Sequence, residues 1–223
     1  MTLPNGGPMK KILIVTPRYP PDIGGIETVV FKQSVGLSKL GNDVRVITTT
    51  NNKDLVGQES IEGVKINRYL GFSPKGAYFF SRGLSKAVRN FSKEYDIIHA
   101  HNYHAFPALS AFKNRMGAKF VITPHYHGGS HSKLRNFLLK PYKYIAKKMI
   151  SGADAVVCVS NSEKELLEGD FSLPKTWTNY NGVEFTDMPI VSGESADTGA
   201  KSICAVGRLE RYKNIDSIIR AAS

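Results

Sequence analysis

Short apolar runs alternate along the chain with segments in which apolar residues recur every three or four positions. The short runs predict β-strands at 10–16, 44–49, 64–69, 96–101, 119–125, 155–159 and 176–180. The periodic segments predict helices at 26–40, 84–91, 106–116, 135–150 and 163–168. Strands and helices that alternate in this way are typical of an α/β fold, here a Rossmann-like, doubly wound parallel sheet with helices on both faces. Ligands of such sheets bind beyond the carboxyl ends of the strands.

The pattern changes after residue 185. Residues 1–8 are expected to be a tail, and residues 9–185 a whole N-terminal domain. Residues 186–201 are polar and rich in turn-forming residues, which favours a linker. An apolar run at 203–206 and a periodic segment at 215–222 then predict the first strand and helix of an incomplete second domain over 202–223.

Composition narrows the class of protein. The 223 residues are 41% hydrophobic and 22% charged, as in ordinary globular proteins. No apolar run approaches the ~20 residues of a membrane span, and the first eight residues do not resemble a signal peptide. Cys158 and Cys204 lie in apolar runs, so we expect two buried free thiols and a reducing, cytoplasmic setting. The net charge of +11 suits an anionic partner, such as nucleotide phosphates, lipid headgroups or nucleic acid.

A glycine pair follows the first predicted strand. Gly24 and Gly25 stand directly before the first predicted helix. Backbone without a Cβ can approach a ligand closely, and the N–H groups of a helix N-terminus suit a phosphate. A plain strand-to-helix turn is the alternative. A nicotinamide site ranks lower, because Gly-x-Gly-x-x-Gly is absent and the second strand ends in threonines rather than an acidic residue.

Histidines gather at the ends of later strands. His99 and His101 are two apart on one strand, so their side chains share a face, and His125 follows the next strand. Hydrogen bonding is the simplest role for them. Zinc is an alternative, but no carboxylate or cysteine recurs at ligand spacing, and we expect no metal site.

Several motifs then occur in one order along the chain: PRYPPDIGGIE, DIIHAH, ITPHYHGG, ADAVVCVSNSEKELL, the step Asn181–Glu184, and AVGRLERYKNIDSIIRAA. Together they resemble family-4 retaining glycosyltransferases of the GT-B architecture, in which two Rossmann-like domains face a cleft. The resemblance implies transfer of a sugar from a nucleotide-sugar donor to a sugar or lipid-linked acceptor. It also implies no cofactor and no metal, and the Asp-x-Asp metal motif is absent. Nucleic acid is not an expected partner.

The resemblance implies a role for each matching residue. His125 would hydrogen-bond the donor sugar as the catalytic residue, and Gly24 and Gly25 would contact the donor phosphates. Arg208 and Lys213 match the cations that hold the donor pyrophosphate, although simple solvation is their alternative here. Residues assigned to the acceptor side are Tyr19, His99, His101 and Asn181.

The family also carries two glutamates, spaced eight apart, further into the second domain, and no residues of this chain correspond to them. We therefore expect the chain to be the acceptor-side portion and to be inactive alone. A non-catalytic module that binds a sugar, a lipid headgroup or a partner is the alternative. Residues 133–150 are basic and amphipathic, which fits either a surface helix packed on the core or peripheral contact with the anionic inner face of a membrane.

Overall fold

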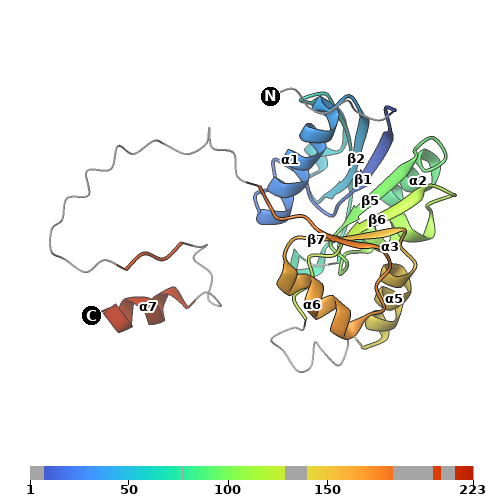
Figure 1. Cartoon of the computed structure of the whole chain (residues 1–223). Helices are drawn as coiled ribbons and strands as arrows, with labels where there is room; N and C mark the ends of the chain where they lie inside the picture. The colour runs from blue at the N-terminus through green and yellow to red at the C-terminus, as the bar shows by residue number, and fades with distance from the viewer. Residues whose placement is uncertain (1–7, 77, 129–139, 183–202, 207–213, 223) are drawn as a thin grey trace. The chain divides into compact units, whose positions relative to one another are not determined.

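A computed structural model describes residues 8–76, 78–128, 140–182, 203–206 and 214–222 (Figure 1). The chain divides into two compact units, residues 1–182 and residues 183–223. The predicted linker at 186–201, and the boundary before it, lie outside the described residues.

The described part of the first unit contains one sheet of eight strands, in the order β3-β4-β2-β1-β5-β6-β7-β8. All neighbouring strands run parallel except β3, which is antiparallel to β4. The predicted α/β class, with a mostly parallel sheet, is confirmed. The strands are β1 (Lys11–Val15), β2 (Asp43–Thr50), β3 (Gly57–Ile61), β4 (Val64–Leu70), β5 (Ile97–His101), β6 (Lys119–Thr123), β7 (Ala155–Cys158) and β8 (Thr176–Thr178).

Strand β3 was not expected from the sequence. Its residues are almost all exposed, so no apolar run marks it. It forms because the chain turns back at Glu62 and Gly63, whose φ angles of 51° and 79° are both positive. Such a turn joins two antiparallel strands directly, and β3 therefore covers the edge of β4.

Five helices cover the sheet within the described residues of the first unit: α1 (Gly25–Lys39), α2 (Arg82–Phe91), α3 (Phe106–Lys113), α5 (Lys140–Ser151) and α6 (Asn161–Asp170). Ser81 and Ser160 cap α2 and α6 by accepting hydrogen bonds from backbone N–H groups. Helix α3 ends three residues before the predicted Met116. The Asn114 side chain bonds the Ser110 carbonyl there, and Met116 and Gly117 then take positive φ angles.

The core lies on both faces of the sheet. Ile12 and Ile14 of β1 pack with Val30 of α1 on one face. Leu13 and Val15 pack on the other face with α2 and α3, and Figure 1 shows α1 and α2 on opposite sides of the sheet. Because β1 is central and covered on both faces, the loop after it has a fixed place at the edge of the sheet.

Helix α5 buries part of its apolar side, while Tyr144 and Ile145 remain exposed. Ala146, Met149 and Ile150 are buried in the core, while Lys147 and Lys148 are exposed. This agrees with the interpretation of a surface helix packed on the core. Residues 133–139 lie outside the described part. Among the described residues, no helix is both long and apolar enough to cross a bilayer.

The described part of the second unit is short. Helix α7 (Ile215–Ala222) forms as predicted, but residues 203–206 form no strand. A strand needs a paired neighbour, and no described segment pairs with these residues. Cys158 is buried as expected, whereas Cys204 is exposed, contrary to expectation.

Candidate functional site

Most of the predicted site residues of the first unit lie near the carboxyl edge of the sheet. Strand β1 pairs with β5, and β5 pairs with β6, so their carboxyl ends are neighbours. The glycine pair follows β1, His101 ends β5, and His125 follows β6. The parallel sheet thus brings together residues far apart in the sequence.

The loop between β1 and α1 is anchored by hydrogen bonds from side chains of β2 and β4. Thr49 of β2 donates a hydrogen bond of 2.6 Å to the Pro17 carbonyl. Arg68 of β4 donates to the carbonyls of Tyr19 and Pro20, and it is paired with Glu59 of β3 at 2.7 Å. The unexpected strand β3 therefore supports this loop through Arg68.

Tyr19, which the sequence assigned to the acceptor side, lies in the core. Its side chain is fully buried, its hydroxyl is hydrogen-bonded to Ser34 at 2.8 Å, and its ring lies against Phe31. Burial raises the pKa of this hydroxyl, so it stays protonated near neutral pH. Tyr19 fastens the loop to α1 from within the core and has no exposed surface to offer a ligand.

The fold itself does not require glycine at Gly24 or Gly25. Gly24 has an extended backbone with φ 175° and ψ 169°, which any residue adopts. A Cβ added at Gly25 would meet nothing within 4 Å, and one at Gly24 would meet only the flexible Glu27 side chain. No side chain caps the helix that begins here. The space beside Gly25 is therefore open at the start of α1, where the first N–H groups of a helix lack partners, whereas the Glu27 carboxylate lies in the space beside Gly24.

His99, His101 and His125 form a compact buried cluster. The ring centroids of His99 and His101 are 4.4 Å apart, and those of His101 and His125 are 5.6 Å apart. His99 Nε2 is hydrogen-bonded to the Thr123 hydroxyl at 2.8 Å, and His101 Nδ1 to His125 Nε2 at 3.3 Å. His101 Nε2 has no hydrogen-bond partner within the described residues.

Burial keeps this cluster uncharged. It lowers the pKa of His99 to about 4, helped by the nearby His125. It likewise lowers the pKa of His125 to about 4, helped by His127, and that of His101 well below its usual value. At neutral pH the three rings are neutral imidazoles that can both donate and accept hydrogen bonds. Among the described side chains, no group of three or more histidines, cysteines or acidic residues is arranged to hold a metal ion.

His125 is fixed by a residue that the sequence did not single out. Glu163, buried at the start of α6, accepts hydrogen bonds from the backbone N–H groups of Tyr126 at 2.6 Å and Val159 at 2.7 Å. It thereby ties the loop after β6 to the end of β7, and His125 in that loop has a positive φ of 52°. The spacing of Ser160 and Glu163 marks a helix start, but it does not reveal the contact with Tyr126.

The remaining predicted residues are not part of this cluster in the described structure. Asn181 is described and exposed, beyond the end of β8. Arg208 and Lys213 lie outside the described residues.

A sequence profile of Glycosyltransferase Family 4 matches residues 23–186. Alpha-monoglucosyldiacylglycerol synthase of Streptococcus pneumoniae is 25% identical over 95% of this chain and 52% of its own length. The O-antigen chain mannosyltransferase C of Escherichia coli is 27% identical over 68% of this chain and 40% of its own length. The chain spans about half the length of the curated relatives it matches.

Solved structures share the fold. Sucrose-phosphate synthase of Thermosynechococcus elongatus superposes with a TM-score of 0.55 at 14% identity, over 77% of this chain and 48% of that one. The Anabaena protein HepE, solved in complex with UDP-glucose, gives a TM-score of 0.55 at 16% identity, over 78% of this chain and 44% of that one.

Proposed function

The chain belongs to glycosyltransferase family 4, and on that premise we propose that it takes part in moving a sugar from a nucleotide-sugar donor to an acceptor with retention of configuration. The observation that carries the proposal is that the open Gly25 and the neutral His125 follow β1 and β6 at the same carboxyl edge of the sheet. In the reaction, the bond between the anomeric carbon and the diphosphate breaks and a bond to an acceptor oxygen forms. The acceptor hydroxyl gives its proton to the departing diphosphate, which leaves as the nucleoside diphosphate.

Each half of this site suits one part of a donor. The N–H groups at the start of α1 can bind diphosphate oxygens once the flexible Glu27 side chain turns away from Gly24, because the positive end of the helix favours an anion and the space beside Gly25 is open. The neutral ring of His125 can bond a sugar hydroxyl without bringing a positive charge close to the anomeric carbon. We propose that no metal ion is needed.

The test is transfer by the whole protein, measured by mass spectrometry with a panel of nucleotide sugars and with a chelator present. The proposal expects product from at least one donor, unaffected by the chelator, with a retained anomeric configuration seen by NMR. His125→Ala should slow turnover strongly, whereas the exposed His127→Ala should not. Equal activity in both variants would contradict the proposed role of His125, and absence of product with every donor would contradict the proposed function.

We further propose that the protein works in the cytoplasm, beside an anionic membrane surface. The net charge of +11 and the exposed Lys147 and Lys148 of α5 support this proposal, because clustered lysines are attracted to anionic lipids. Sedimentation with phosphatidylglycerol vesicles should exceed that with phosphatidylcholine vesicles, and replacing both lysines by glutamine should reduce the difference. Equal sedimentation with the two lipids would contradict it.

A further inference from the structure

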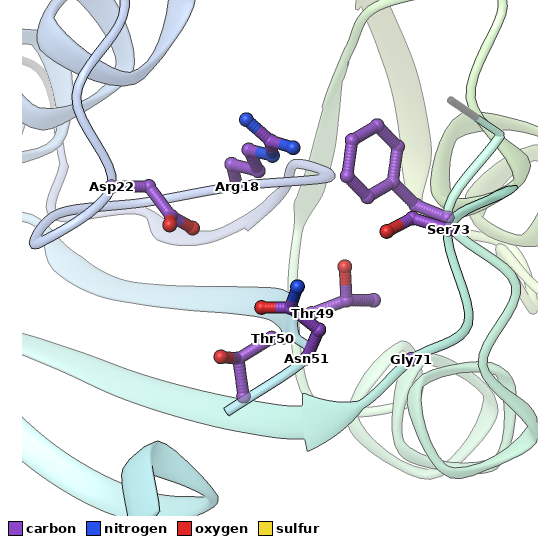
Figure 2. A pocket seen from close by; sticks show the side chains of 8 residues that line it. Arg18, Asp22, Thr49, Thr50, Asn51, Gly71 and Ser73 are labelled. Carbon is purple, nitrogen blue, oxygen red and sulfur yellow. The ribbon is translucent and has the colours of Figure 1, made fainter. Parts of the chain in front are cut away.

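A pocket that the proposed donor residues do not use opens over the carboxyl ends of β2 and β4 (Figure 2). Asp22 and Arg18 reach it from the loop that carries the glycine pair, so it adjoins the proposed donor site. Figure 2 shows the side chains of Asp22 and Ser73 on opposite sides of the pocket. Its lining combines charged, hydroxyl, amide and aromatic groups: Arg18, Asp22, Thr49, Asn51, Ser73 and Phe79.

Within the part of the chain that the structure describes, two opposite charges in this pocket are not paired with another charge. Within the described residues, no hydrogen bond or ion pair engages the Arg18 guanidinium or the Asp22 carboxylate. The guanidinium lies 5.0 Å from the centre of the Phe79 ring, which holds it in place. A cation and an anion together leave the pocket without net charge, while they offer strong donors and strong acceptors to a ligand.

Three large apolar side chains stand next in sequence to lining residues and are exposed, and we call them the rim. Ile23, next to Asp22, is 94% exposed, and Phe72, between Gly71 and Ser73, is 69% exposed. Phe80, next to Phe79, is 45% exposed. Exposed large apolar side chains clustered beside a polar pocket are a feature of binding surfaces.

The rim is also rigid. The backbones of Phe72 and Phe80 exchange two hydrogen bonds of 2.8 Å, and the Phe80 ring lies 5.4 Å from that of Phe106. Tyr78 and Phe79 have positive φ angles of 68° and 52°, which large side chains rarely adopt. The structure therefore holds the Phe72 and Phe80 backbones and the Phe80 ring in place before any ligand arrives, which lowers the entropy cost of binding.

We propose that this pocket binds the acceptor, and that the acceptor is an amphiphile with an uncharged, hydroxyl-bearing head group and an apolar chain. This inference rests on the proposed function, whose acceptor it specifies. Asp22 accepts hydrogen bonds from head-group hydroxyls, and Arg18 donates to their oxygens. The apolar chain lies on Phe72 and Phe80. The balanced charges of Arg18 and Asp22 favour a neutral head over an anionic one.

Binding in the absence of any donor tests the proposal. Three probes are titrated into the protein by NMR or calorimetry: methyl glucoside, octyl glucoside below its critical micelle concentration, and octyl phosphate. Octyl glucoside should bind at least about tenfold more tightly than methyl glucoside, because only its chain can cover the rim. It should also bind more tightly than octyl phosphate. Equal affinity of the two glucosides, or tighter binding of octyl phosphate, would overturn the proposal.

Variants separate the head from the chain. Asp22→Asn should weaken the binding of octyl glucoside. If this variant binds octyl phosphate more tightly but octyl glucoside as before, the assignment of a neutral head group would be overturned. Phe72→Ser should remove most of the advantage of the octyl chain. Trp177→Ser is the matched control, because Trp177 is 46% exposed and lies on β8, at the opposite edge of the sheet from β3 and β4. If Phe72→Ser and Trp177→Ser lose octyl glucoside affinity equally, the assignment of the rim to the octyl chain would be overturned.

These outcomes are distinct from those of the proposed function. The titrations involve no donor and no turnover, so transfer to another kind of acceptor with no octyl glucoside binding would overturn only the acceptor class. Octyl glucoside binding that depends on Asp22 and Phe72, without transfer from any donor, would instead overturn only the proposed reaction.

Discussion

Replacing His99 by glutamine should make the protein less sensitive to mild acid. His99 is buried, and its pKa is lowered from 6.5 to about 4, chiefly by desolvation. In the unfolded chain the ring binds a proton near pH 6.5, so between the two values the unfolded state holds more protons than the folded state. Stability is therefore full above about pH 6.5 and falls as the pH drops toward 4. At pH 5 the loss from one such histidine is about 2 kcal/mol.

That loss is large against the ~5–15 kcal/mol that stabilises a typical domain. Urea unfolding at pH 7 and pH 5 measures it, because this range lies above the pKa of ordinary carboxyl groups. His99→Gln can still bond the Thr123 hydroxyl but does not titrate, so it should lose about 2 kcal/mol less than the wild type over this range. The exposed His127→Gln should keep most of the wild-type sensitivity. If His99→Gln and the wild type lose the same free energy, His99 does not titrate as a buried neutral ring.

Three further predictions concern the same edge of the sheet. Glu163→Ala should lower the free energy of unfolding by about 2–4 kcal/mol, because the buried N–H groups of Tyr126 and Val159 lose their acceptor; a change near zero in urea unfolding would contradict this. Zinc or a chelator should leave the melting temperature unchanged, and stoichiometric zinc retained after dialysis would refute that expectation. His125→Ala should reduce turnover about 100-fold while calorimetry shows nearly unchanged nucleotide affinity, and an equal loss in both would contradict contact with the sugar alone.

Hydrophobic patterning predicted most of the fold, because the central strands β1, β2, β5 and β6 are mostly buried and each carries a short apolar run. The same rule placed His99 and His101 on one face of β5, and their rings do lie together. Strand β3 escaped prediction because almost all of its side chains are exposed, and only backbone pairing with β4 creates it. Residues 203–206 are the opposite case, since an apolar run without a paired neighbour forms no strand.

The site could be predicted where its residues are neighbours in the sequence. It could not be predicted where its contacts join residues that are far apart in the sequence. Gly24 and Gly25 stand next to the helix they open, so the sequence is enough to place them. The burial of Tyr19 depends on Ser34 and Phe31, which its own motif does not reveal. The contact of Glu163 with Tyr126 spans 37 positions. The pairing of Arg18 with Phe79 likewise joins two loops that only the folded sheet brings together.

Gly25 gives the most direct test of the account, because the space beside it serves no contact of the fold. An added Cβ meets nothing within 4 Å at Gly25, and equally nothing at Gly36 in the same helix. Transfer by the whole protein is therefore compared for Gly25→Val and Gly36→Val, with melting temperatures measured alongside. The account predicts that both variants stay folded, that Gly36→Val transfers normally, and that Gly25→Val loses at least about 100-fold in rate. Near-normal transfer by a folded Gly25→Val would contradict the claim that donor phosphate binds over this pair.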